Sequence, residues 1–224
     1  MVAFLTGPMF VIALLVFVLG MLGRMVWYVR GLDWRLDRVA YRPFFSFGLK
    51  GGLHSAVKWL IPFATDGWRK NPLLAAATFV FHLGAVLVPL FFVGHAVILR
   101  GVFGFSLPVL PAGLMDCLTV LTLAGLAALA VRRLCVRQAR TLSTAGDWLL
   151  LLLVAMPVAS GFASTHAGAE GAYMAHLITG TLFLLLAPFT RLAHCVLYFL
   201  SRIQIGMDFA IKRGGRTRGA FFPW

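Results

Sequence analysis

The sequence contains little charge, and very little of it is acidic. Charged residues make up 12% of the 224 positions, and seven Asp and Glu stand against twenty Lys and Arg. Hydrophobic residues make up 61%, with a mean hydropathy of +0.92. Soluble globular domains carry about 25% charged residues and are about half apolar. The composition therefore excludes an ordinary soluble domain and indicates a membrane protein.

Cysteine is also scarce. Cys117, Cys135 and Cys195 are the three in the sequence, and no two of them form a CxxC pair. This pattern excludes the usual zinc and iron–sulfur spacings and the CxxCH motif that attaches a c-type haem. The sequence also lacks a phosphate-binding glycine loop and a nucleophile–base constellation. We therefore expect no catalytic residues in this chain.

Long apolar runs are the dominant feature. Crossing a bilayer core of roughly 30 Å takes about 20 helical residues. We predict an all-α polytopic membrane protein, a single membrane domain over residues 1–224, with five transmembrane helices. The spans are expected at about 3–23, 73–99, 114–131, 148–164 and 172–200. Pro89, Pro157 and Pro188 lie inside three of them and are expected to kink their helices.

Basic residues alternate between the connections. The second connection contains only Arg100 and the fourth contains no Lys or Arg, whereas the first connection, the third connection and the tail each contain four or more basic residues. The basic residues of the first connection are Arg30, Arg35, Arg38, Arg42, Lys50, Lys58, Arg69 and Lys70. The positive-inside rule then places the N-terminus outside and the C-terminus in the cytoplasm. We therefore interpret the net charge of +13 as that of basic residues that set the orientation in the membrane and attract anionic lipid. We expect no nucleic-acid binding.

The connection at residues 28–72 is the longest, and it mixes basic with aromatic side chains such as Trp34, Trp59 and Trp68. Such a mixture is typical of an amphipathic segment at the inner membrane interface, of a docking surface for a cytoplasmic subunit, or of both. Residues 201–224 are expected to form a short basic and aromatic cytoplasmic tail.

Four histidines lie near the ends of two apolar spans. His82 and His95 are in the second span, and His176 and His194 are in the fifth. Ionisable side chains inside a membrane are costly and therefore need a partner or a cofactor. Because the two spans run in opposite directions, topology pairs His82 with His194 near the inner face and His95 with His176 near the outer face.

Neutral imidazole is a common axial ligand of haem iron, and helix bundles build such sites from facing helices. The four histidines therefore predict two b haems, one near each membrane face. Thirteen residues place His82 and His95 on different sides of an ideal helix, a mismatch that a kink at Pro89 can relieve. His54 and His166 are expected at the interfaces rather than as ligands.

The fifth span also carries a recognisable string. The run from His176 to Gly180, followed by Pro188-Phe-Thr-Arg-Leu-Ala-His194, resembles the nitrate reductase gamma-subunit family of membrane cytochromes b. The second span from Phe81 to His95 is similar to the matching element of that family. Length and the aromatic inner connection are most similar to the cytochrome b subunits of transmembrane redox complexes in sulfate-reducing bacteria, of the high-molecular-weight cytochrome c complex type.

The resemblance implies a five-helix diheme subunit in a bacterial inner membrane, with His82, His95, His176 and His194 as iron ligands. It implies electron transfer between a quinone such as menaquinone, or a periplasmic multihaem cytochrome c, and a cytoplasmic iron–sulfur subunit. Such a subunit is not catalytic alone. Two alternatives remain open at this point: an ion- or proton-coupled transporter, and a haem-free membrane anchor.

Overall fold

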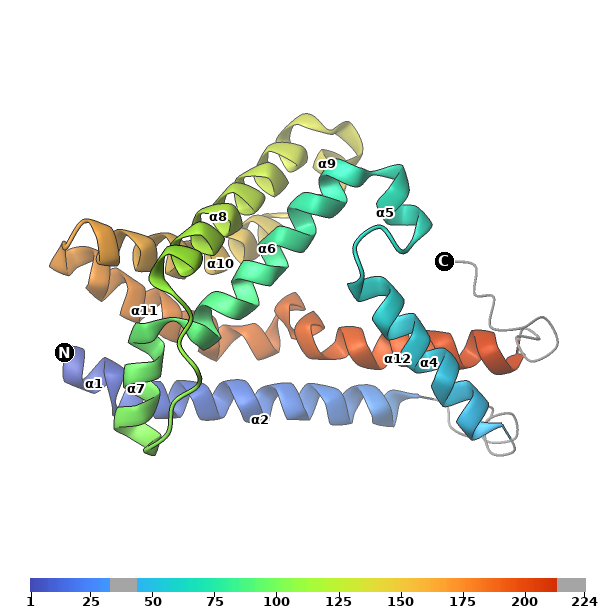
Figure 1. Ribbon diagram of the computed structural model, residues 1–224, viewed down its shortest axis with the longest axis horizontal. Coiled ribbons are helices and arrows are strands. Elements are labelled where there is room, and N and C mark those ends of the chain that lie inside the picture. Colours follow the sequence, from blue (N-terminus) through green and yellow to red (C-terminus); the bar gives the residue numbers. More distant parts are fainter. Residues whose placement is uncertain (33–43, 213–224) are drawn as a thin grey trace. The chain divides into compact units, whose positions relative to one another are not determined.

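The computed structural model describes residues 1–32 and 44–212, and every regular element among them is helical (Figure 1). Five segments are long and apolar enough to cross a membrane: Val2–Gly31, Pro72–Phe91, Ala112–Cys135, Ala145–His166 and Glu170–Phe189. The prediction of an all-α chain with five such helices is confirmed. Which side each end of the chain occupies stays a prediction. Residues 33–43 of the first connection and 213–224 of the tail lie outside the described residues.

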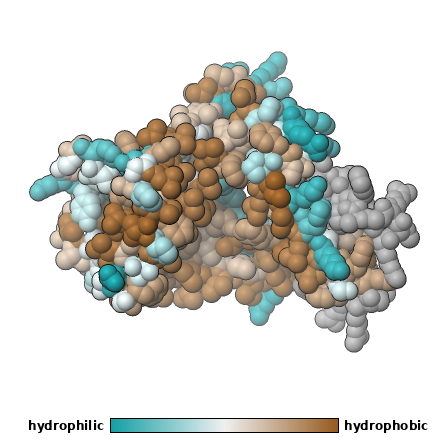
Figure 2. All heavy atoms as spheres, viewed as in Figure 1, coloured by the Kyte–Doolittle hydropathy of each residue, from teal (hydrophilic) through white to brown (hydrophobic). Residues whose placement is uncertain are grey.

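Large apolar side chains cover the surface of these helices. Leu19, Val97 and Leu149 are all more than 60% exposed. Figure 2 shows apolar residues over much of the viewed face. Exposed apolar stretches of this size would be a liability in water, whereas lipid favours them. The chain is therefore compatible with a multi-pass membrane protein.

The chain divides into two compact units. The first comprises Met1–Val18 and Ala76–Thr190, and the second comprises the described parts of Leu19–Ala75 and Arg191–Trp224. The first contains α1 (Val2–Thr6), α7 (Val93–Phe103), α8 (Ala112–Cys135), α9 (Arg137–Leu142), α10 (Ala145–His166) and α11 (Glu170–Leu186). The second contains α4 (Phe45–Leu60), α5 (Asp66–Lys70) and α12 (His194–Lys212). The helices α2 (Pro8–Gly31) and α6 (Pro72–Phe91) contribute to both.

Two predicted spans end earlier than expected. The span expected at 73–99 is helix α6, which ends at Phe91, and α7 begins after Phe92 has taken an extended conformation. Pro89 removes one helical hydrogen bond just before this break, which lowers the cost of interrupting the helix. The Phe91 carbonyl instead accepts a 3.1 Å bond from the Leu110 N–H. His95 therefore lies on a separate helix from His82.

The span expected at 172–200 also breaks. Helix α11 ends at Leu186, two short 3-10 turns follow at Ala187–Phe189 and Arg191–Ala193, and α12 begins at His194. Pro188 cannot donate a helical hydrogen bond, and Thr190 between the turns is extended. Residues 201–212, expected in the tail, form the greater part of α12 instead. By contrast α10 continues through Pro157 without interruption.

In the first unit, α10 packs along α11 and against α8. The α10–α11 connection is short, and Gly168 within it has φ of +59°, a conformation that a side chain would strain. At its start, α10 is capped because the Asp147 carboxylate accepts a 2.9 Å bond from the Thr144 N–H. On α6, Gly84 faces α8 so closely that a Cβ there would lie 2.8 Å from the Leu118 carbonyl oxygen.

In the second unit, α4 packs along α12. The contacts run in opposite order along the two helices, because Gly48 lies against Ile211 whereas Ser55 lies against Gly206. The helices are therefore antiparallel. Small residues of α4 form the buried side of the pair: Gly48, Gly51, Gly52, Ser55 and Ala56.

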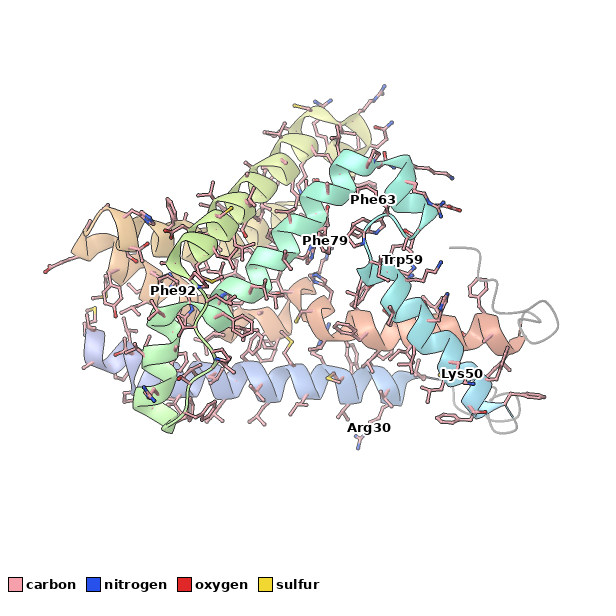
Figure 3. The ribbon with its side chains drawn as sticks, in the orientation of Figure 1. Arg30, Lys50, Trp59, Phe63, Phe79 and Phe92 are labelled. Carbon is pink, nitrogen blue, oxygen red and sulfur yellow. The ribbon has the colours of Figure 1, made fainter. Side chains whose placement is uncertain are left out.

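The other side of α4 is apolar and exposed. Phe45, Leu49, Leu53, Val57 and Leu60 follow one another at helical spacing, and each is at least 36% exposed. Lys50 and Lys58 belong to the same helix (Figure 3 labels Lys50). The amphipathic segment predicted within 28–72 is therefore a helix. Its placement at a membrane interface stays a prediction.

Candidate functional site

His176 is anchored by a neighbouring helix. Its Nδ1–H donates a 2.8 Å hydrogen bond to the Pro157 carbonyl oxygen of α10. A Cβ at Gly161 would lie 2.9 Å from that same Nδ1, so the glycine makes room for the ring. Because a carbonyl oxygen only accepts, the proton is on Nδ1 and the lone pair is on Nε2. When a histidine binds a metal through one ring nitrogen, a hydrogen bond of this kind from the other nitrogen orients the ring and fixes its tautomer.

His95 lies beside His176. The two ring centroids are 5.8 Å apart, with an angle of 20° between the ring planes. The Phe92 ring approaches His95 edge-on at 5.7 Å. The Nδ1 of His95 is buried and has no hydrogen-bond partner among the described residues. The structure thus brings together the two histidines that the sequence pairs near the outer face.

The pair can be compared with what a bare metal ion and a haem each require. Structural zinc takes four protein ligands and catalytic zinc takes three. Within the described residues no group of three His, Cys, Asp or Glu side chains could hold an ion. A haem supplies four nitrogens itself and needs only two axial ligands from the protein. The pair supplies two imidazoles, one of which has its Nδ1 bonded to a backbone carbonyl.

In His82 and His194, as in His176, the Nδ1 is hydrogen-bonded to a backbone carbonyl oxygen. His82 donates from Nδ1 to the Thr78 carbonyl oxygen at 2.7 Å. His194, the first residue of α12, donates to the Arg191 carbonyl oxygen at 2.9 Å. Both side chains are exposed. The two residues belong to different units, and their pairing stays a prediction.

His166 has a different environment. Its Nε2 lies 3.4 Å from an Asp116 carboxylate oxygen, and its Nδ1 lies 3.1 Å from the Phe162 carbonyl oxygen. Both ring nitrogens thus face partners from the protein. The expectation that His166 is not an iron ligand stays a prediction.

An apolar pocket lies next to the outer histidine pair. Phe92, which Figure 3 labels and which contacts His95, also lines this pocket of about 440 Å³ in the first unit. The other lining residues are Val93, Val109, Leu110, Pro111, Ala112 and Met115. Sequence reasoning missed Phe92 and the Pro157 carbonyl as parts of this site. In the sequence, the small residue Gly161 within an apolar helix is the feature that could have indicated the contact between His176 and the Pro157 carbonyl.

The five apolar helices define an all-helical chain of the kind found in multi-pass membrane proteins. The chain is 57% identical, over 226 aligned positions covering the whole of both chains, to a protein of Nitratidesulfovibrio vulgaris (strain Hildenborough) whose description states no function. It belongs to the same family as that protein. No family model matches the chain, and no solved structure matches it.

Proposed function

We propose that this chain is a diheme b-type cytochrome, an electron-transfer subunit of a membrane redox complex. The observation that carries the proposal is the His95–His176 pair, with rings 5.8 Å apart and the His176 Nδ1 bonded to a backbone carbonyl. His82 and His194, whose Nδ1 atoms are bonded in the same way, would hold the second haem. The subunit is not an enzyme by itself.

A haem held by these histidines would supply one-electron redox chemistry, and the residues around it would set its potential. A hydrogen bond from Nδ1–H to a carbonyl makes the imidazole a stronger donor, which favours the ferric state. Apolar side chains around the ring, such as Phe92, lower the local dielectric and favour the state of lower charge. The balance of these two effects determines the potential of the outer haem.

The membrane context follows from the helices and the basic residues. We place the protein in the bacterial inner membrane with its C-terminus in the cytoplasm, because basic connections alternate with nearly uncharged ones. The exposed apolar side of α4 and its lysines suit contact with lipid and with an anionic membrane surface.

The partners follow from the two faces. A cytoplasmic iron–sulfur subunit would dock on residues 28–72 and the tail, where Arg, Lys, Trp and Phe are concentrated. At the outer face, the pocket beside Phe92 is apolar and of a size that suits the ring of a quinone such as menaquinone. A periplasmic multihaem cytochrome c is the other electron partner proposed at this face.

Haem content tests the proposal. We expect the purified protein to hold two b haems per chain in a pyridine haemochrome assay, with a low-spin spectrum in the reduced state. His176→Ala should remove one of them, and His194→Ala should remove the other. Absence of haem from the purified wild-type protein would show that the chain is a transporter or a simple anchor instead. A single haem lost in both variants would refute the pairing.

A further inference from the structure

One face of α12 carries three residues that can bind an anion or a metal. His194, Tyr198 and Arg202 are each four residues apart, so they follow one another along the same side of the helix. Tyr198 lies one turn and Arg202 two turns from His194, about 6 and 12 Å along the axis.

Helix α4 supplies a fourth group. The Arg202 guanidinium carbon lies 4.1 Å from the centroid of the Trp59 ring. Trp59 is near the C-terminal end of α4 (labelled in Figure 3). The close antiparallel packing of α4 on α12 through Ser55 and Gly206 holds Trp59 in this position. All of these residues belong to the second unit.

The donors of this cluster lack acceptors. The Trp59 Nε1, the Tyr198 hydroxyl and the Arg202 Nε are each buried, and none has a hydrogen-bond partner among the described residues. Arg202 also forms no ion pair within the part of the chain that the structure describes. Buried polar groups are normally satisfied, so a set of unsatisfied donors beside a cation indicates a missing acceptor. A guanidinium N–H together with an indole N–H and a phenolic O–H suits a carboxylate or another anionic oxygen.

We infer that Trp59, Tyr198 and Arg202 bind a propionate carboxylate of the haem that His194 ligates. The inference rests on the proposed function. It follows from the shared face of α12, on which Tyr198 and Arg202 follow the proposed ligand His194. An anionic lipid headgroup offers similar chemistry, but a headgroup site would lie exposed at the surface, and these donor atoms are buried.

The binding has a consequence for the haem potential. Arg202 would place a positive charge beside the propionate and balance its negative charge. Removing that charge favours the ferric state, so the midpoint potential of this haem should fall. The propionate would also become easier to protonate, and the potential would then depend on pH near neutrality.

Redox titration of single variants tests the inference. Arg202→Gln should lower the ferrous-to-ferric ratio of one haem about tenfold at a fixed potential, equivalent to a shift of about 59 mV for one electron. The haem affected should be the one that His194→Ala removes, and the other should be unchanged. Arg202→Lys should give a smaller shift, because it keeps the charge and loses the planar fork. Lys58→Gln is the matched control, since Lys58 adjoins Trp59 and its loss removes the same charge; it should shift neither haem.

A second variant separates binding from folding. Tyr198→Phe removes only a hydroxyl that has no partner in the described chain, so the melting temperature of the haem-free protein should not fall. Loss of the inner haem to apomyoglobin should nevertheless become several-fold faster. The titrations are done in nanodiscs of phosphatidylcholine, and repeated with added phosphatidylglycerol.

The outcomes are distinct. Haem-free wild-type protein overturns the proposed function. Two haems whose potentials and retention are unaffected by Arg202→Gln and Tyr198→Phe overturn this inference alone. Shifts that appear only with phosphatidylglycerol present also overturn it and assign the cluster to a lipid headgroup.

Discussion

At the scale of single residues, the outer site depends on how the imidazoles are held as much as on the histidines themselves. The sequence identifies His95 and His176 by their residue type and their level in the membrane. The hydrogen bond from His176 to the Pro157 carbonyl depends on a contact between α10 and α11. Gly161 makes that contact possible because its missing side chain leaves space for the ring.

Gly161→Ala should therefore disrupt haem binding at the proposed His95–His176 site. The added Cβ would lie 2.9 Å from the His176 Nδ1 and 3.0 Å from its Cε1, so the ring must move. We expect a destabilisation of about 1–3 kcal/mol and partial loss of one haem. Haem absorbance and thermal unfolding measure the two effects.

The matched control is Gly180→Ala. Gly180 lies on α11, one turn beyond His176, and a Cβ there would meet nothing within 4 Å. Alanine is a better helix former than glycine, so this variant should be as stable as the wild type or more so. Equal behaviour of the two variants would mean that the His176 ring tolerates displacement and that the glycine does not position it.

At the scale of elements, the helix breaks and the α4–α12 pair shape the molecule. Three prolines lie in apolar segments, yet α10 passes through Pro157 while the chain breaks next to Pro89 and Pro188. A proline removes one hydrogen bond in every case, and whether the helix ends depends on what replaces the bonds around it. The break after Phe91 is supported by the bond from Leu110, a contact remote in sequence.

Gly206→Ala should destabilise the α4–α12 pair. A Cβ at Gly206 would lie 2.7 Å from the Gly52 Cα and 2.7 Å from the Ser55 Cβ, so the two backbones would have to separate. We expect a loss of about 1–3 kcal/mol, measured by unfolding in mixed micelles of mild detergent and dodecyl sulfate. Gly67→Ala on α5 is the control, because nothing lies within 4 Å of its added Cβ. Should both variants unfold at the same point, the close packing of the pair would not be a source of stability.

At the scale of the whole molecule, the proposed function needs a defined orientation in the membrane. The five apolar helices are compatible with several orientations of the ends, and the alternation of basic residues is the evidence for one of them. The third connection contains Arg137 and Arg140, whereas the fourth contains no Lys or Arg. Lys and Arg are retained on the cytoplasmic side during insertion, so the fourth connection should lie outside.

Cysteine labelling in intact cells tests this orientation. In a variant with Cys117, Cys135 and Cys195 replaced by Ala, a single new cysteine is introduced at Ala169 or at Arg137, both of which are exposed. We expect a membrane-impermeant maleimide to label the Ala169→Cys variant in intact cells. The Arg137→Cys variant should react only after permeabilisation. The reverse labelling pattern would show that the protein has the opposite orientation in the membrane. The inner and outer assignments of the two proposed haem sites would then be exchanged.

The sequence alone determined the all-helical class, the existence of five apolar helices and the set of candidate ligands. These properties follow from composition and from apolar length, because a bilayer requires long helices whatever their arrangement. The sequence did not predict where the second and fifth spans end, because helix ends depend on backbone hydrogen bonds to remote residues, such as the one from Leu110.

Only the tertiary structure decided which side chains meet. It placed His95 on its own helix beside His176, and it put Trp59 over Arg202 through the packing of α4 on α12. Spacing along one helix shows which residues share a face, so His194, Tyr198 and Arg202 could have been aligned from the sequence. Contacts between helices depend on how closely their backbones approach, which small residues such as Gly161 and Gly206 permit. That approach is a property of two segments together, and for this reason it could not be inferred from either one.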